Sequence, residues 1–176
     1  MKQSSFQVVI DACLVIDAFV ADAVYHENAV NIIQQCKDLN ATMFFPMTGM
    51  IEFQRAISRP DVGPRLKREG KWGPGISMPI FKDGISFKYI NIDVHFLTEY
   101  MDITLPYMKA SDYLYLCIAA KECIPLITAD DNLLARCQEA NIVGIDYKNT
   151  TDLTAFVVWY FAAMLPSHTF TGRMAQ

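Results

Sequence analysis

Short, mostly apolar segments alternate along this chain with longer segments in which apolar residues recur every three or four positions. The short segments have the length and content of buried strands, and they lie at 6–12, 41–45, 125–129 and 143–146. Helical spacing occurs at 14–24, 26–39, 110–122, 133–140 and 151–165. Strands alternating with helices predict an α/β fold, with a mostly parallel central sheet between two helical layers, the three-layer α/β/α arrangement.

This alternation stops at Pro60. Residues 60–84 hold five of the eight glycines and four of the eight prolines, which predicts a loop-rich insertion within a single domain spanning residues 1–176. After it, the alternation at 85–89 predicts a strand, in a hairpin with residues 77–82. Asp93 is then positioned to cap a short helix.

Composition excludes several classes of protein. With 52% hydrophobic and 19% charged residues, the chain is too apolar and too weakly charged for intrinsic disorder. The longest apolar stretch, 153–165, has 13 positions, whereas a membrane span needs about 20. The polar residues 1–7 do not resemble a secretory signal, and the five cysteines form no C-x-x-C pair. We therefore expect a cytoplasmic protein without a disulfide framework, a zinc site or a membrane association.

Charge is distributed unevenly. The net charge is −4, yet six of the 15 basic residues fall between positions 55 and 71, namely Arg55, Arg59, Arg65, Lys67, Arg68 and Lys71. Only Asp61 and Glu69 oppose them there. Such a segment can bind phosphates, as in RNA, or can be ordinary solvated surface.

Acidic residues recur where the predicted strands end and the following helices begin. Because the carboxyl ends of parallel strands share one edge of a sheet, we expect four of them to converge there: Asp11, Glu52, Asp112 and Asp130. Glu52 lies about one turn into a helix for which Thr48 is the predicted N-cap. Structural roles are also open: Asp112 suits a helix dipole, Asp130 a helix cap, and Glu52 a pair with Arg55. Of the adjacent residues Asp130 and Asp131, we assign Asp131 as the cap of helix 132–140.

Four converging carboxylates would repel one another strongly unless a cation lay between them. Mg²⁺ and Mn²⁺ prefer carboxylate and water oxygens, whereas the three scattered histidines offer no zinc pattern. A divalent cation in such a site suits the hydrolysis of a phosphodiester. The acids therefore predict a metal-dependent phosphodiesterase.

The order of these residues resembles the PIN domain. The matching stretches, within residues 6–150, are VVIDACLVIDAFV, FPMTGMIEFQRAI and KASDYLYLCIAAKECIPLITADDNLL. The resemblance implies a Mg²⁺- or Mn²⁺-dependent ribonuclease, similar to VapC-type toxins that an antitoxin protein holds in check. It makes Asp11, Glu52, Asp112 and Asp130 the metal-binding acids and Thr128 a hydroxyl that orients the site. The implied partners are RNA and an antitoxin.

Cys13 departs from the family, which usually has Asn, Ser or Thr two residues after the first Asp. This departure motivates an alternative, a catalytically inactive PIN-like domain that binds RNA or a protein partner. A haloacid-dehalogenase-type phosphatase requires a second Asp at the position of Cys13. A receiver domain requires a buried Lys after a late strand, and this sequence has no clear counterpart of it. Both are weaker alternatives.

The role of two groups of aromatic residues remains open. A helical set predicts core packing or a homodimer interface, at Phe156, Trp159, Tyr160 and Phe161. A second set lies around Asp112 and can stack RNA bases, although we expect at least two of its members to be packed: Tyr107, Tyr113 and Tyr115.

Overall fold

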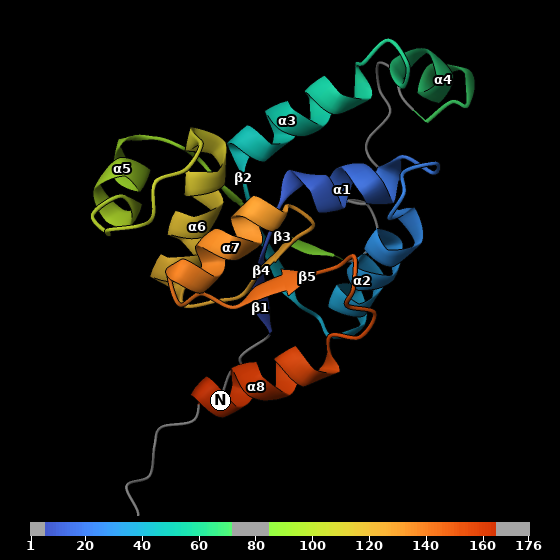
Figure 1. The fold of residues 1–176 in the computed structure, drawn as a ribbon. Helices are drawn as coiled ribbons and strands as arrows, with labels where there is room; N and C mark the ends of the chain where they lie inside the picture. The colour runs from blue at the N-terminus through green and yellow to red at the C-terminus, as the bar shows by residue number, and fades with distance from the viewer. Residues whose placement is uncertain (1–5, 72–84, 165–176) are drawn as a thin grey trace, which may run out of the picture.

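The computed structural model describes residues 6–71 and 85–164, and a parallel sheet lies at its centre (Figure 1). Its strands are β1 (Gln7–Ile10), β2 (Thr42–Pro46), β3 (Ser86–Ile90), β4 (Leu126–Thr128) and β5 (Gly144–Asp146). Their spatial order is β3-β2-β1-β4-β5, and every neighbouring pair is parallel. In the central register, Val9 lies opposite Phe44 on one side and Leu126 on the other.

Helices cover both faces of this sheet. They are α1 (Ala12–Phe19), α2 (His26–Asp38), α3 (Met47–Ile57), α4 (Gly63–Arg68), α5 (Val94–Tyr100), α6 (Ala110–Glu122), α7 (Asp131–Glu139) and α8 (Thr154–Met164). Figure 1 shows α1 and α2 on one side of the strands and α6 and α7 on the other. Helix α6 packs on β1, β2 and β4, while α7 packs on β4 and β5. The predicted three-layer α/β/α fold is therefore confirmed.

The central position of β1 explains its sequence. Val8, Val9 and Ile10 are completely buried, because neighbouring strands and helices enclose both faces of the strand. Helix α6 is apolar nearly all round for the same reason, and residues 115–119 are all buried, because the helix packs on the sheet and also contacts α5. Within the described residues, no helix is long and apolar enough to cross a membrane.

Several local predictions need correction. Helix α1 ends at Phe19 rather than at residue 24, because residues 20–25 turn toward α2 and leave Val24 exposed. Thr48 is not an N-cap, since Pro46 precedes the helix and no cap hydrogen bond from a side chain forms. The Thr48 hydroxyl is instead buried without a hydrogen-bond partner among the described residues.

The segment around the predicted insertion is partly helical. Helix α4 forms inside residues 60–84, with Pro64 in its first turn. Strand β3 pairs in parallel with β2, whereas the proposed hairpin partner at 77–82 lies outside the described residues. The assignment of residues 1–176 to one domain with an insertion therefore stays a prediction.

Candidate active site

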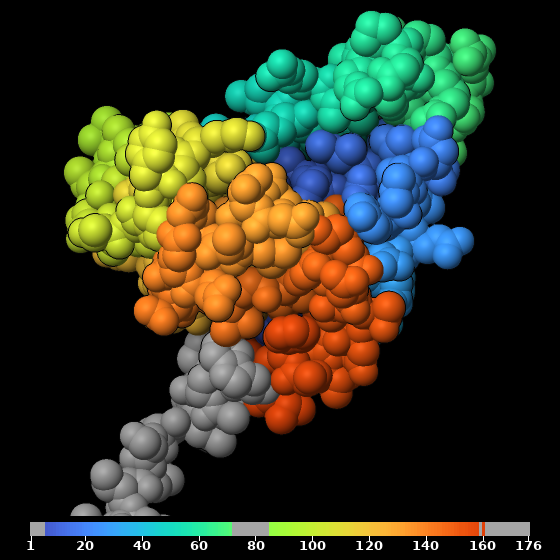
Figure 2. All heavy atoms as spheres, viewed as in Figure 1, coloured from blue at the N-terminus to red at the C-terminus, as the bar shows by residue number. Residues whose placement is uncertain are grey.

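The four predicted acids line a single groove at the carboxyl edge of the sheet. Its volume is about 500 Å³, and its lining is Asp11, Ala12, Cys13, Ile16, Glu52, Arg55, Ala56, Arg59, Asp112 and Asp130. We call it the acidic groove. In Figure 2 the blue surface of α1 lies recessed between α3, in teal, and α7, in orange. Parallel strands thus bring together acids that are as much as 119 positions apart in sequence.

Asp11 forms the most enclosed part of the acidic groove, with only 8% of its surface exposed. Its Oδ2 accepts hydrogen bonds from the Thr128 hydroxyl at 2.6 Å and from the Cys13 thiol at 2.8 Å. Burial raises the pKa of the Asp11 carboxyl above its ordinary value, the two hydrogen bonds oppose this, and the charge of Glu52 adds to it. A buried carboxylate of this kind needs compensation, and its hydrogen-bond donors provide part of it.

Cys13 lies two residues after Asp11, where the resemblance noted above implies Asn, Ser or Thr. Its thiol donates to Asp11 and accepts a hydrogen bond from the Ala129 backbone N–H at 3.4 Å. Burial, together with the neighbouring Asp11 charge, raises the pKa of this thiol, so it remains a protonated donor. The thiol thus supplies one of the two side-chain hydrogen bonds that Asp11 accepts.

Thr128 and Asp130 connect the end of β4 to the start of α7. The completely buried Thr128 hydroxyl donates to Asp11 and accepts from the backbone N–H of Asp130 at 3.0 Å. Asp130, not Asp131, caps α7, because its Oδ1 accepts from the backbone N–H groups of Asn132 and Leu133 at 2.8 and 3.1 Å. Asp131 instead pairs with Lys148, outside the groove. The cap uses one oxygen of Asp130, and the other has no hydrogen bond within the described residues.

Tyr115, one of the three tyrosines near Asp112, positions Glu52, a role that the sequence does not predict. Its hydroxyl donates to Glu52 Oε2 at 2.8 Å and accepts from the Ala12 backbone N–H at 3.2 Å, and so links α6, α3 and α1. Gly49 leaves room for this arrangement, since a Cβ there would lie 2.7 Å from the Tyr115 hydroxyl and 2.5 Å from the Phe45 ring. The available signal was a tyrosine three positions after Asp112 in an otherwise apolar stretch.

Asp112 reaches the acidic groove from the first turn of α6. Its Oδ1 accepts from the Ser111 hydroxyl at 3.2 Å, and its other oxygen has no hydrogen bond within the described residues. A carboxylate at this position also interacts favourably with the positive end of the helix dipole. The dipole role and the groove position are therefore compatible.

The basic segment 55–71 is less available for phosphates than its sequence indicates. Arg65 pairs with Asp22 and Glu69, Lys71 also pairs with Glu69, and Arg59 pairs with Asp61 at 2.7 Å. Arg55 forms no ion pair within the described residues and lines the acidic groove one turn after Glu52. Its alternative role as the partner of Glu52 is therefore wrong.

The donor set of the acidic groove fits a hard divalent cation that keeps part of its water shell. Each of the four carboxylates lacks a Lys or Arg ion pair among the described residues, although Arg55 and Arg59 also line the groove. Within the same residues no three His, Cys, Asp or Glu side chains form a ready-made ligand cluster. Mg²⁺ usually binds through one or two carboxylates, waters and substrate phosphate rather than in a closed protein cage.

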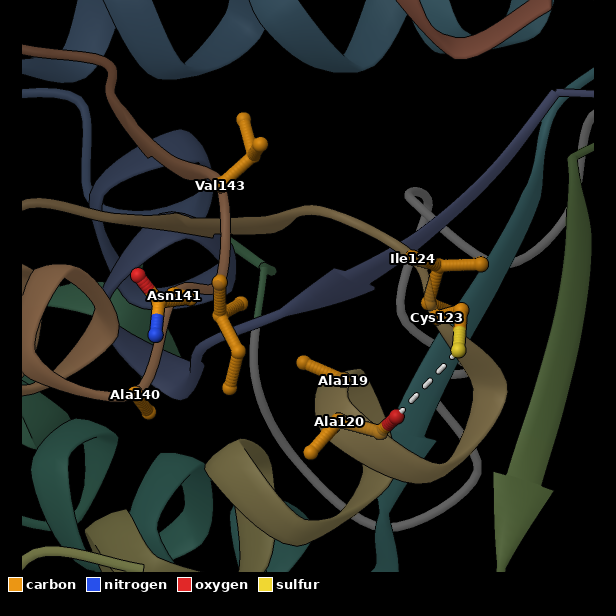
Figure 3. Close-up of a pocket in the computed structure, with 8 residues that line it drawn as sticks. Ala119, Ala120, Cys123, Ile124, Ala140, Asn141 and Val143 are labelled. Carbon is orange, nitrogen blue, oxygen red and sulfur yellow. Dashed lines mark hydrogen bonds between the residues drawn. The ribbon is translucent and has the colours of Figure 1, made fainter. Parts of the chain in front are cut away.

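A cavity at the opposite edge of the sheet has a different character (Figure 3). It measures about 250 Å³ and lies where α6 and α7 end, before β4 and β5 begin. None of its lining side chains is charged, and the Cys123 thiol is directed to the Ala120 carbonyl at 3.6 Å. Of these two cavities, only the acidic groove at the carboxyl edge has charged lining residues.

The acids, the Thr128 link and the parallel sheet agree with an independent comparison. The family model described as "PIN domain" matches residues 8–139, which include all four acids. The chain belongs to the PIN domain family. PIN domain proteins are generally nucleases that use divalent metal ions, and this membership removes the phosphatase and receiver alternatives.

Solved structures contain the same PIN fold. A chain from the crystal structure of VapBC2 from Rickettsia felis bound to a DNA fragment from their promoter is similar, with a TM-score of 0.52 and 13% sequence identity. The similarity covers 79% of this chain and 97% of that chain. A comparison with curated proteins finds no match.

Proposed function

We propose that this PIN domain is a Mg²⁺- or Mn²⁺-dependent endoribonuclease that hydrolyses phosphodiester bonds of RNA. The observation that carries the proposal is the meeting of Asp11, Glu52, Asp112 and Asp130 in one groove without a basic ion-pair partner among the described residues. Such a site favours a cation, and phosphodiester hydrolysis is the chemistry that a cation held by carboxylates supports best.

Each side chain has a distinct part in the proposal. A bound divalent cation supplies activation of a water and stabilisation of charge on the leaving oxygen. Asp11, Glu52, Asp112 and Asp130 would hold the cation, while Thr128 and Cys13 fix the Asp11 carboxylate. Arg55 is free to bind a substrate phosphate beside the acids.

The biological setting is also proposed. The VapBC2 structure supports a VapC-like toxin whose antitoxin binds it. A homodimer is part of the proposal as well. All five cysteines are free, which agrees with the reducing cytoplasm that we propose as the location of the protein. Co-purification with the product of an adjacent small gene, if it encodes a DNA-binding protein, would test the antitoxin.

Metal removal is the direct test of the proposed activity. We expect single-stranded RNA to be cleaved in Mg²⁺ or Mn²⁺ and to stay intact in EDTA, because in the proposed mechanism the bound cation supplies both the activation of water and the stabilisation of the leaving oxygen. Gel electrophoresis of end-labelled RNA measures this. Undiminished cleavage in EDTA would contradict the metal-dependent mechanism.

The alternative is an inactive PIN domain that binds RNA or a protein, and Cys13 distinguishes the two. We expect Cys13→Ser to retain or increase RNA cleavage, since a serine hydroxyl is the better donor to Asp11. The rate of cleavage and the melting temperature should be measured together. If neither the parent nor Cys13→Ser cleaves RNA while both are stabilised by Mg²⁺, the inactive alternative is supported.

A further inference from the structure

A second groove adjoins the acidic groove. It measures about 310 Å³ and is lined by Tyr107, Met108, Lys109, Asp112, Asn132 and Arg136. We call it the side groove. Asp112 belongs to the lining of both grooves, so the side groove opens directly beside the acids. A polymer bound at the four acids can therefore continue into the side groove.

The side groove offers the polar groups that single-stranded RNA requires. Lys109 forms no ion pair within the described residues, so its ammonium group is available for a phosphate. The Asn132 side chain forms no hydrogen bond within the same residues and can pair with the edge of a base. Arg136 also lines the groove and pairs with Glu139 at 2.6 Å.

Tyr107 supplies an aromatic surface. Of the three tyrosines near Asp112, Tyr115 is buried and holds Glu52, and the Tyr113 hydroxyl donates to the Ile103 carbonyl. Tyr107 is 95% exposed, so its ring contributes almost nothing to folding. Proteins that bind single strands combine exposed aromatic rings, which stack on the bases, with positive charges, which bind the backbone phosphates. Tyr107 and Lys109 provide this combination.

We infer that the side groove binds the nucleotide adjacent to the scissile phosphate of single-stranded RNA, an inference that rests on the proposed ribonuclease function. Tyr107 stacks on the base, Lys109 binds the neighbouring phosphate, and Asn132 contacts the base edge. A duplex would not fit this arrangement, because its bases are already stacked and paired. The side groove thereby selects unpaired RNA for the acids.

Binding and cleavage should be measured separately. Fluorescence anisotropy in EDTA, with a labelled single-stranded RNA of about eight nucleotides, gives Kd without turnover. We expect Tyr107→Ala to raise Kd by about fivefold to about 150-fold, and Tyr107→Phe, which keeps the ring, to change it by about twofold or less. Lys109→Gln should flatten the slope of log Kd against log salt concentration by about 0.7, whereas Lys37→Gln on α2, outside both grooves, serves as the matched charge control.

The two proposals can fail independently. If the parent cleaves RNA in Mg²⁺ and Tyr107→Ala binds RNA as tightly as the parent, the side-groove inference is wrong and the ribonuclease stands. If Tyr107→Ala weakens binding but the parent cleaves no RNA, the binding of single-stranded RNA in the side groove is supported, whereas the ribonuclease proposal and the position of the groove beside a scissile phosphate are wrong. A parent that does not bind single-stranded RNA overturns the side-groove inference, whatever its activity.

Discussion

Asp130→Asn is expected to lower RNA cleavage by at least about 100-fold without destabilising the protein, because losing a metal ligand should cost at least as much as losing the outer-shell partner of one. The cap of α7 should survive, since an asparagine oxygen can accept the same hydrogen bonds from Asn132 and Leu133. Removing one of the four negative charges should also raise the melting temperature of the metal-free protein slightly. Cleavage assays and thermal melts measure the two effects.

Mg²⁺ separates the role of Asp130 at the site from its role as a cap. At about 100 times its Kd, the cation should stabilise the parent by about 2.7 kcal/mol, or about 5–10 °C in melting temperature. Asp130→Asn should be stabilised much less. The matched control is Asp131→Asn, which alters the adjacent carboxylate, 84% exposed and paired with Lys148 outside the groove. Equal Mg²⁺ shifts for the two variants would mean that Asp130 does not hold the cation.

Tyr115→Phe should impair the acidic groove indirectly, because Tyr115 does not line the groove but holds Glu52, which does. The change removes the donor to Glu52 and leaves the buried Ala12 N–H without its acceptor. The orphaned N–H should cost about 1–3 kcal/mol of stability. Loss of the positioning hydrogen bond should reduce Mg²⁺ affinity or cleavage by about 10–100-fold.

A titration of activity against Mg²⁺ concentration, well below the melting temperature, distinguishes positioning from folding. We expect the half-saturating Mg²⁺ concentration to rise for Tyr115→Phe. Tyr113→Phe is the control, because it removes a tyrosine hydroxyl from the same helix. That hydroxyl donates to the Ile103 carbonyl, and neither residue lines either groove. If Tyr115→Phe only lowers the melting temperature and leaves the Mg²⁺ dependence unchanged, Tyr115 is merely structural.

Sequence periodicity determined the architecture because its signals are local. The fully apolar run around Val8–Ile10 is stable only when both of its faces are covered, which is typical of a central strand in a parallel sheet. Once the strands are parallel, their carboxyl ends share an edge, so the position of Asp11 after β1 and of Asp130 after β4 already predicts that the two lie close together. The convergence of the acids followed from the order of elements and did not need atomic detail.

The tertiary structure decided which partners these residues have. Whether Asp130 or Asp131 caps α7 depends on the turn after β4, which periodicity does not describe. Arg65 is neutralised by Asp22, 43 positions away, and Glu52 is held by Tyr115, 63 positions away. Likewise, Tyr107, Tyr113 and Tyr115 look equivalent in sequence, yet one is exposed and two have hydrogen-bonded hydroxyls. Such contacts depend on distances between segments that are remote along the chain, and only the folded arrangement of those segments sets them.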